Sequence, residues 1–165
     1  MNTGFSSHLP RTLIINVPEV DRQHDELFRE LATLKSMCIE QNALPLERAE
    51  ALFDSLVEHC ATEERLALDA GVDFRVHREK HGRMLKGIRK MLNEVEHEKL
   101  DVFTLIRYID YWFERHISEE DKGLGIALQL ASQGYVSDKY AGHGPASETM
   151  WGGVDNRAMR PGQLV

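Results

Sequence analysis

The chain has only two cysteines among its 165 residues, Cys38 and Cys60, and they do not form a CxxC pair. Two isolated cysteines cannot build the disulfide framework of a small secreted domain, which favours a reducing compartment. The sequence also lacks an apolar stretch long enough to cross a membrane, and its short apolar run near the amino terminus is shorter than the core of a signal peptide. We therefore expect a cytoplasmic protein that is not embedded in a membrane.

Positive charge is scarce as well. The chain has 20 Lys and Arg residues against 27 Asp and Glu residues, which gives a formal net charge of −7. The basic residues are scattered among acidic ones and form no patch, so the charge pattern argues against a nucleic-acid partner or an anionic lipid surface. What the chain does have is 42% hydrophobic residues, enough for the core of one domain of this length.

Four segments carry apolar residues at helical spacing, and prolines, an aspartate and glycines mark where they begin and end. The expected helices are 18–41, 45–71, 73–97 and 101 to the glycines at 123 and 125, with one or two further turns in 126–131. The predicted fold is all-α, an antiparallel up-down-up-down four-helix bundle over residues 18–131. We expect an irregular arm at 1–17 and an irregular Gly- and Pro-containing tail at 132–165, which could contact a protein partner or a second copy.

Histidines and carboxylates recur on these helices at metal-ligand spacing. His59 and Glu63 are four residues apart, as are His77 and His81, and residues four apart share one face of a helix. The outer helices add three more candidates, His24, His116 and Asp121. Imidazoles and carboxylates without thiolates suit iron, manganese or zinc. Seven ligands exceed the need of one tetrahedral ion, whereas two ions sharing the carboxylates and a solvent oxygen would use all seven and leave one ion with a vacant position.

The order H, HxxxE, HxxxH, HxxxxD resembles the hemerythrin family, specifically its bacterial branch. An acidic residue and a glutamine precede the first histidine, and a tryptophan lies four residues before the last one. The resemblance covers about residues 17–130 and implies a non-heme di-iron centre with an oxo or hydroxo bridge. It implies that one iron binds His77, His81 and His116, that the other binds His24 and His59, and that Glu63 and Asp121 bridge them. It also implies reversible dioxygen binding at the second iron, for storage, delivery or sensing.

The residues expected to line the oxygen pocket are Leu27, Cys60, Trp112, Phe113 and Ile117. Cys60 departs from the family, in which phenylalanine usually follows the ligand of the second helix, and Gly71 and Val72 replace the usual Tyr-Pro before the third helix. A smaller side chain at position 60 would open the pocket to solvent or to ligands other than dioxygen. The alternatives are a di-iron redox enzyme, of the peroxidase or nitric oxide reductase type, and an oxygen- or redox-sensing signalling module.

Overall fold

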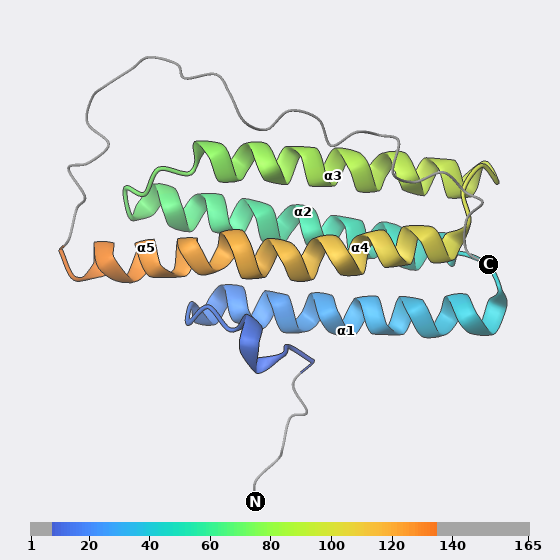
Figure 1. Cartoon of the computed structure of the whole chain (residues 1–165), viewed down its shortest axis with the longest axis horizontal. Helices are drawn as coiled ribbons and strands as arrows, with labels where there is room; N and C mark the ends of the chain where they lie inside the picture. Colours follow the sequence, from blue (N-terminus) through green and yellow to red (C-terminus); the bar gives the residue numbers. More distant parts are fainter. Residues whose placement is uncertain (1–7, 135–165) are drawn as a thin grey trace, which may run out of the picture.

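The computed structural model describes residues 8–134, so the expected tail beyond residue 134 and the first seven residues of the arm lie outside the described part. The described chain forms an antiparallel four-helix bundle, and the predicted fold class is confirmed. Figure 1 shows the four long helices lying side by side. They are α1 (Pro18–Gln41), α2 (Leu46–Asp69), α3 (Arg75–Glu96) and α4 (Val102–His116), followed by a π-helical turn, η2 (Ile117–Asp121), and α5 (Lys122–Ser132).

Local sequence signals account for most helix ends. Pro18 is the first residue of α1, where its missing N–H costs no hydrogen bond. The Asp101 side chain accepts a hydrogen bond of 3.0 Å from the Thr104 backbone N–H and caps α4. Asn42 ends α1 in the left-handed conformation, with φ of 48°, and Gly71 adopts φ of 67° in the turn between α2 and α3. These short turns make successive helices antiparallel.

The helical segment that begins with α4 continues beyond the two glycines at which the sequence predicts its end. Gly123 and Gly125 were expected at its end, but the chain passes through both and stays helical to Ser132. Gly125 is buried, and a β carbon built on it would lie 2.5 Å from the backbone oxygen of Ile15. The glycine therefore permits a close approach between α5 and the arm rather than ending the helix.

The arm before α1 is more regular than expected. It contains a short 3₁₀ helix, η1 (Arg11–Leu13), and its buried side chains are those of Leu9, Leu13 and Ile15. The Asp25 carboxylate accepts a hydrogen bond from the Leu9 N–H at 2.9 Å, and the Asp21 carboxylate accepts one from the Ile15 N–H at the same distance. Side chains of α1 thus satisfy the arm's backbone while its aliphatic residues join the core.

The contact between α5 and the arm gives a matched pair of substitutions. Gly125→Ala is expected to lower the free energy of unfolding by about 1–3 kcal/mol, because its methyl group collides with the Ile15 carbonyl. A β carbon built on Gly123 meets no heavy atom within 4 Å. Gly123→Ala is therefore expected to raise the free energy of unfolding by up to about 1 kcal/mol, because alanine has the higher helix propensity. Urea unfolding of the two variants measures the difference. Equal stabilisation by both would contradict the close approach.

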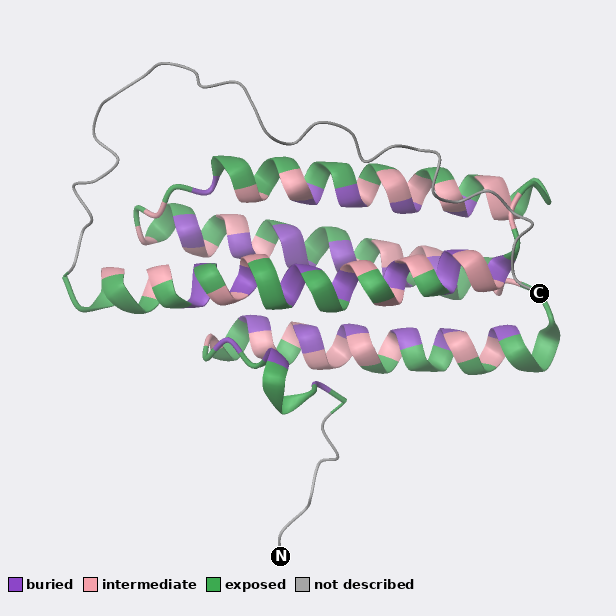
Figure 2. Cartoon of the chain, in the orientation of Figure 1, coloured by how far each residue is buried: buried purple, intermediate pink, exposed green. Residues whose placement is uncertain are grey.

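The buried residues face inward along all four long helices (Figure 2). Some apolar residues of these helices are exposed, among them Ile39 at 69% and Val57 at 42%. Each follows a buried residue, Cys38 or Leu56, and successive residues of an α-helix point about 100° apart, so both face away from the core. None of the described helices combines the length and apolar composition that a membrane crossing requires.

Candidate metal centre

The structure brings all seven candidate ligands into one interior cluster, within the half of the bundle that contains the turn between α2 and α3. Six of the side chains are buried, and His77 is 10% exposed. The cluster divides into two groups. Within each group, the ligand atoms all lie within 4.8 Å of one another. One group is Glu63, His77, His81, His116 and Asp121, and the other is His24, His59, Glu63 and Asp121. The two groups therefore share both carboxylates.

The larger group surrounds one point. The His116 Nε2 atom lies 3.0 Å from His77 Nε2 and 2.8 Å from His81 Nε2. Glu63 Oε2 is 3.3 Å from His81 Nε2, and Asp121 Oδ1 is 3.0 Å from His116 Nε2. Two atoms that bind one cation at a right angle, each about 2.1 Å away, are separated by about 3.0 Å. The spacing fits ligands around a single metal ion.

The smaller group uses the other oxygen of each carboxylate. Asp121 Oδ2 lies 3.2 Å from His24 Nε2, whereas its Oδ1 faces the larger group. Glu63 Oε1 lies 3.8 Å from His59 Nε2, whereas its Oε2 faces His77 and His81. Each carboxylate thus offers one oxygen to each group, which is the arrangement that a bridging ligand requires.

Six of the polar atoms that point into the cluster have no hydrogen-bond partner in the described part of the chain. They are Nε2 of His24 and His59, both Glu63 oxygens and both Asp121 oxygens. Leaving a buried polar atom unpaired costs about 1–3 kcal/mol, and more for a charged one. Cations bound in the two groups would satisfy all six atoms. The residues present therefore fit a metal site, and the donor set of imidazoles and carboxylates suits iron, manganese or zinc.

Burial keeps the histidines in the form that binds metals. Burial, with a smaller contribution from the neighbouring His24, lowers the pKa of His59 to about 3. Burial also lowers the pKa of His81, with smaller contributions from His116 and His77. These imidazoles are neutral at physiological pH, so a lone pair on the ring is available to a cation without release of a proton.

The two carboxylates differ in their protonation. Burial raises the pKa of Glu63, and the charge of Asp121 raises it further. Burial also opposes ionisation of Asp121, but interactions with the imidazoles of His116, His24 and His77 overcome it and hold the pKa of Asp121 below its usual value. Without a cation, the cluster therefore favours one negative charge over two. A bound cation favours the ionised form of both residues.

The π-helical turn decides which acidic residue reaches the site. Residues four apart share a face of an α-helix, so a regular helix would align His116 with Glu120. In the turn from Ile117 to Asp121 five residues complete the turn, and Asp121 lies in the cluster instead. The neighbouring Glu120 is partly exposed and pairs with Lys80 of α3 instead.

Aromatic rings border the cluster. Phe113 is buried, and its ring centroid lies 5.7 Å from that of His24 and 6.4 Å from that of His59. Trp112 is partly buried and stacks on His116 at 5.5 Å. The other residues predicted to line an oxygen pocket, Leu27, Cys60 and Ile117, are buried in the core.

Sequence reasoning missed Phe74, whose ring lies 4.5 Å from His77 and 5.7 Å from His81. Its spacing of three and seven residues before these two ligands is the signal that places it on their helix face. The same reasoning missed Gln23 and Thr62 as partners behind His59.

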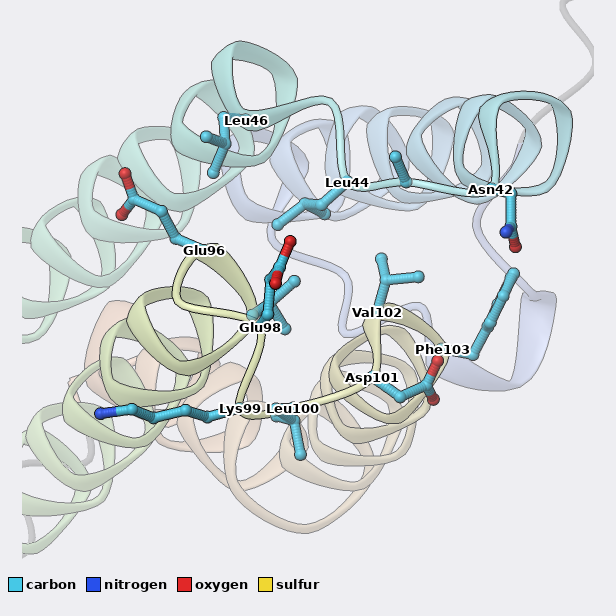
Figure 3. A pocket seen from close by; sticks show the side chains of 12 residues that line it. Asn42, Leu44, Leu46, Glu96, Glu98, Lys99, Leu100, Asp101, Val102 and Phe103 are labelled. Carbon is cyan, nitrogen blue, oxygen red and sulfur yellow. The ribbon is translucent and has the colours of Figure 1, made fainter.

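A surface hollow lies elsewhere on the described part of the chain. It has a volume of about 620 Å³ and is lined by residues of the α1–α2 and α3–α4 connections, among them Leu44, Leu46, Leu100 and Val102. Figure 3 shows these side chains around the hollow. The connections lie at the opposite end of the bundle from the α2–α3 turn, and the hollow contains none of the seven candidate ligands. It is therefore separate from the candidate metal centre.

The comparisons agree with the geometry. The family profile described as the Hemerythrin HHE cation binding domain matches residues 16–126. This segment covers more than half of the chain and contains all seven candidate ligands. No curated protein and no solved structure matches the chain. The resemblance predicted from the histidine and carboxylate spacing is thus confirmed, and the chain belongs to the hemerythrin family.

Proposed function

We propose that the bundle holds two iron ions and binds dioxygen reversibly, for storage, delivery or sensing in the cytoplasm. The observation that carries the proposal is the division of the cluster into groups of five and four residues that share Glu63 and Asp121. An ion held by His24, His59 and the two carboxylates would have fewer protein ligands than an ion held by the group of five, and would leave room for a small external molecule to bind.

The chemistry of the ligands favours binding over oxygen activation. Five of the seven residues are histidines, and neutral imidazoles add no negative charge that would stabilise iron in very high oxidation states. When bound, a pair of iron ions supplies electrons to dioxygen and recovers them when dioxygen leaves. The residues of the chain would orient the ions and keep water away. Phe113, whose buried ring lies edge-on to His24 and His59, is suited to the second task.

A redox enzyme of the peroxidase or nitric oxide reductase type is the second candidate, because Cys60 occupies a buried position next to the ligand His59. Burial raises the pKa of the Cys60 thiol, and the charges of Glu63 and Asp121 raise it further. The thiol therefore stays protonated, whereas the reactive form of cysteine is the thiolate. This property supports Cys60 as a small packing residue and favours the first candidate.

The domain boundaries remain part of the proposal. We assign the oxygen-binding unit to residues 18–131, with residues 1–17 as an arm whose described part, residues 8–17, packs on it. The tail, 132–165, lies mostly outside the described residues. It is proposed as the segment that contacts a protein partner or a second copy.

Aeration of the reduced protein tests the function. The metal-free chain is loaded with ferrous iron under anaerobic conditions, and optical spectra are recorded as air is admitted and then removed. We expect a coloured oxygen adduct that disappears when oxygen is removed and returns on a second aeration. Rapid irreversible bleaching, or sustained turnover of peroxide or nitric oxide, would favour the enzyme instead. Failure to bind two irons per chain would contradict the di-iron assignment.

A further inference from the structure

A series of hydrogen bonds links α1 and α2 and ends at His59, one of the candidate ligands. The Thr62 hydroxyl donates to the Glu58 backbone carbonyl at 3.0 Å. The Gln23 side-chain Nε2 donates to the Thr62 Oγ at 2.9 Å. The other end of the same amide, Gln23 Oε1, lies 3.2 Å from the Nδ1 atom of His59. These hydrogen bonds thus connect the Glu58 backbone, through the side chains of Thr62 and Gln23, to the imidazole of His59.

The donors and acceptors in this series of hydrogen bonds determine which ring nitrogen of His59 carries the hydrogen. A threonine hydroxyl carries one hydrogen, and here the Glu58 carbonyl accepts it, so the Thr62 oxygen must accept from the Gln23 amide. That contact turns the amide oxygen toward His59. An amide oxygen cannot donate, so the hydrogen between them belongs to Nδ1. In the neutral ring, Nε2 then carries the lone pair, and it is Nε2 that faces the carboxylates.

Two other buried histidines, His24 and His116, lack such a partner among the described residues. Nδ1 of His24 and Nδ1 of His116 are buried, and neither has a hydrogen-bond partner among the described residues. His24 and His59 are the two imidazoles of the four-residue group, so only one of them is held by a side chain from behind. A hydrogen-bond acceptor behind a metal-binding imidazole fixes its orientation and raises its basicity.

We propose that Gln23 is a positioning residue that holds His59 with Nε2 free and thereby strengthens metal binding at the four-residue group. The proposal rests on the two-metal assignment made above. It explains how the position with fewer protein ligands retains its ion. It also predicts that the two metal-binding steps respond differently to a change at residue 23, because the five-residue group does not include His59.

Two measurements on the full chain test the role of Gln23. Nitrogen NMR of the metal-free protein reports which ring nitrogen of His59 carries the hydrogen, and anaerobic titration with ferrous iron gives both binding constants. In Gln23→Leu we expect the Nδ1–H preference to be lost and one binding step to weaken by about 10–100-fold, with the other unchanged. Gln23→Glu keeps an acceptor, since the Thr62 hydroxyl can turn to donate to it, and is expected to restore both properties. Gln41→Leu, at the exposed end of α1, is the matched control and should leave both unchanged.

The outcomes separate the two proposals. An unchanged His59 tautomer in Gln23→Leu, or equal binding constants in Gln23→Leu and wild type, would overturn the role of Gln23. Equal weakening of both steps, together with a lower melting temperature of the metal-free variant, would indicate a structural role and overturn it as well. If the wild-type chain binds no iron, the di-iron function fails, and the NMR result still decides whether Gln23 sets the tautomer.

Discussion

Asp121→Ala is expected to remove at least one of the two metal ions per chain, whereas Glu120→Ala is expected to retain both. The two acidic residues are adjacent, but the π-helical turn places only Asp121 in the cluster, with one oxygen toward each group. Glu120 pairs with Lys80 instead. The loss should exceed the about 10–100-fold drop in affinity that follows removal of a residue behind a metal ligand, because Asp121 itself would touch the ions.

Elemental analysis of the iron-loaded variants measures this difference. Asp121→Asn serves as a second variant of nearly the same size, and circular dichroism checks that each protein retains its helices. Retention of two ions in both Asp121 variants would rule out Asp121 as a bridging ligand. Loss of metal from Glu120→Ala would mean that the helix is regular at this point and that the π-helical turn does not select the ligand.

Glu63→Gln is expected to act in opposite directions on metal binding and on the stability of the metal-free protein. Glutamine has a single, neutral side-chain oxygen and cannot offer one oxygen to each group as Glu63 does, so at least one ion should be lost. In the absence of metal the Glu63 carboxyl is fully buried without a hydrogen-bond partner among the described residues and its ionisation is unfavourable, so replacing it with a neutral amide should raise the free energy of unfolding by about 1–3 kcal/mol at neutral pH. Glu64→Gln is the matched control, because Glu64 is 34% exposed and pairs with Arg78.

The gain in stability should depend on pH. Burial raises the pKa of Glu63 above its usual 4.5, so the folded state holds a proton that the unfolded state releases. Below pH 4.5 the carboxyl is protonated in both states, and wild type and variant should have similar stability. As the pH rises through the folded-state pKa, the wild type alone loses stability. Urea unfolding of the metal-free proteins at pH 4.5 and pH 8 measures the change, and a gain that is equal at both values would contradict an ionisation at Glu63.

The sequence alone was sufficient to predict the four helices and to place candidate ligands in pairs on one face of a helix. The apolar period and the helix-ending residues are local, and His59 with Glu63, or His77 with His81, share a face on any α-helix. The same local pattern misled us at Gly125, because a glycine that ends a helix and one that permits a close contact look alike in sequence. Its contact with Ile15 joins residues that are far apart in the chain.

Only the tertiary structure decided how the four helices are rotated about their axes, and the site depends on that rotation. It brings Glu63 and Asp121, from α2 and the π-helical turn, between two sets of imidazoles. It also places Gln23 of α1 against His59 of α2, residues 36 positions apart. Spacing within one helix sets which side chains share a face. Which faces meet is decided by packing among all the helices, because side-chain contacts between helices form only in the assembled core.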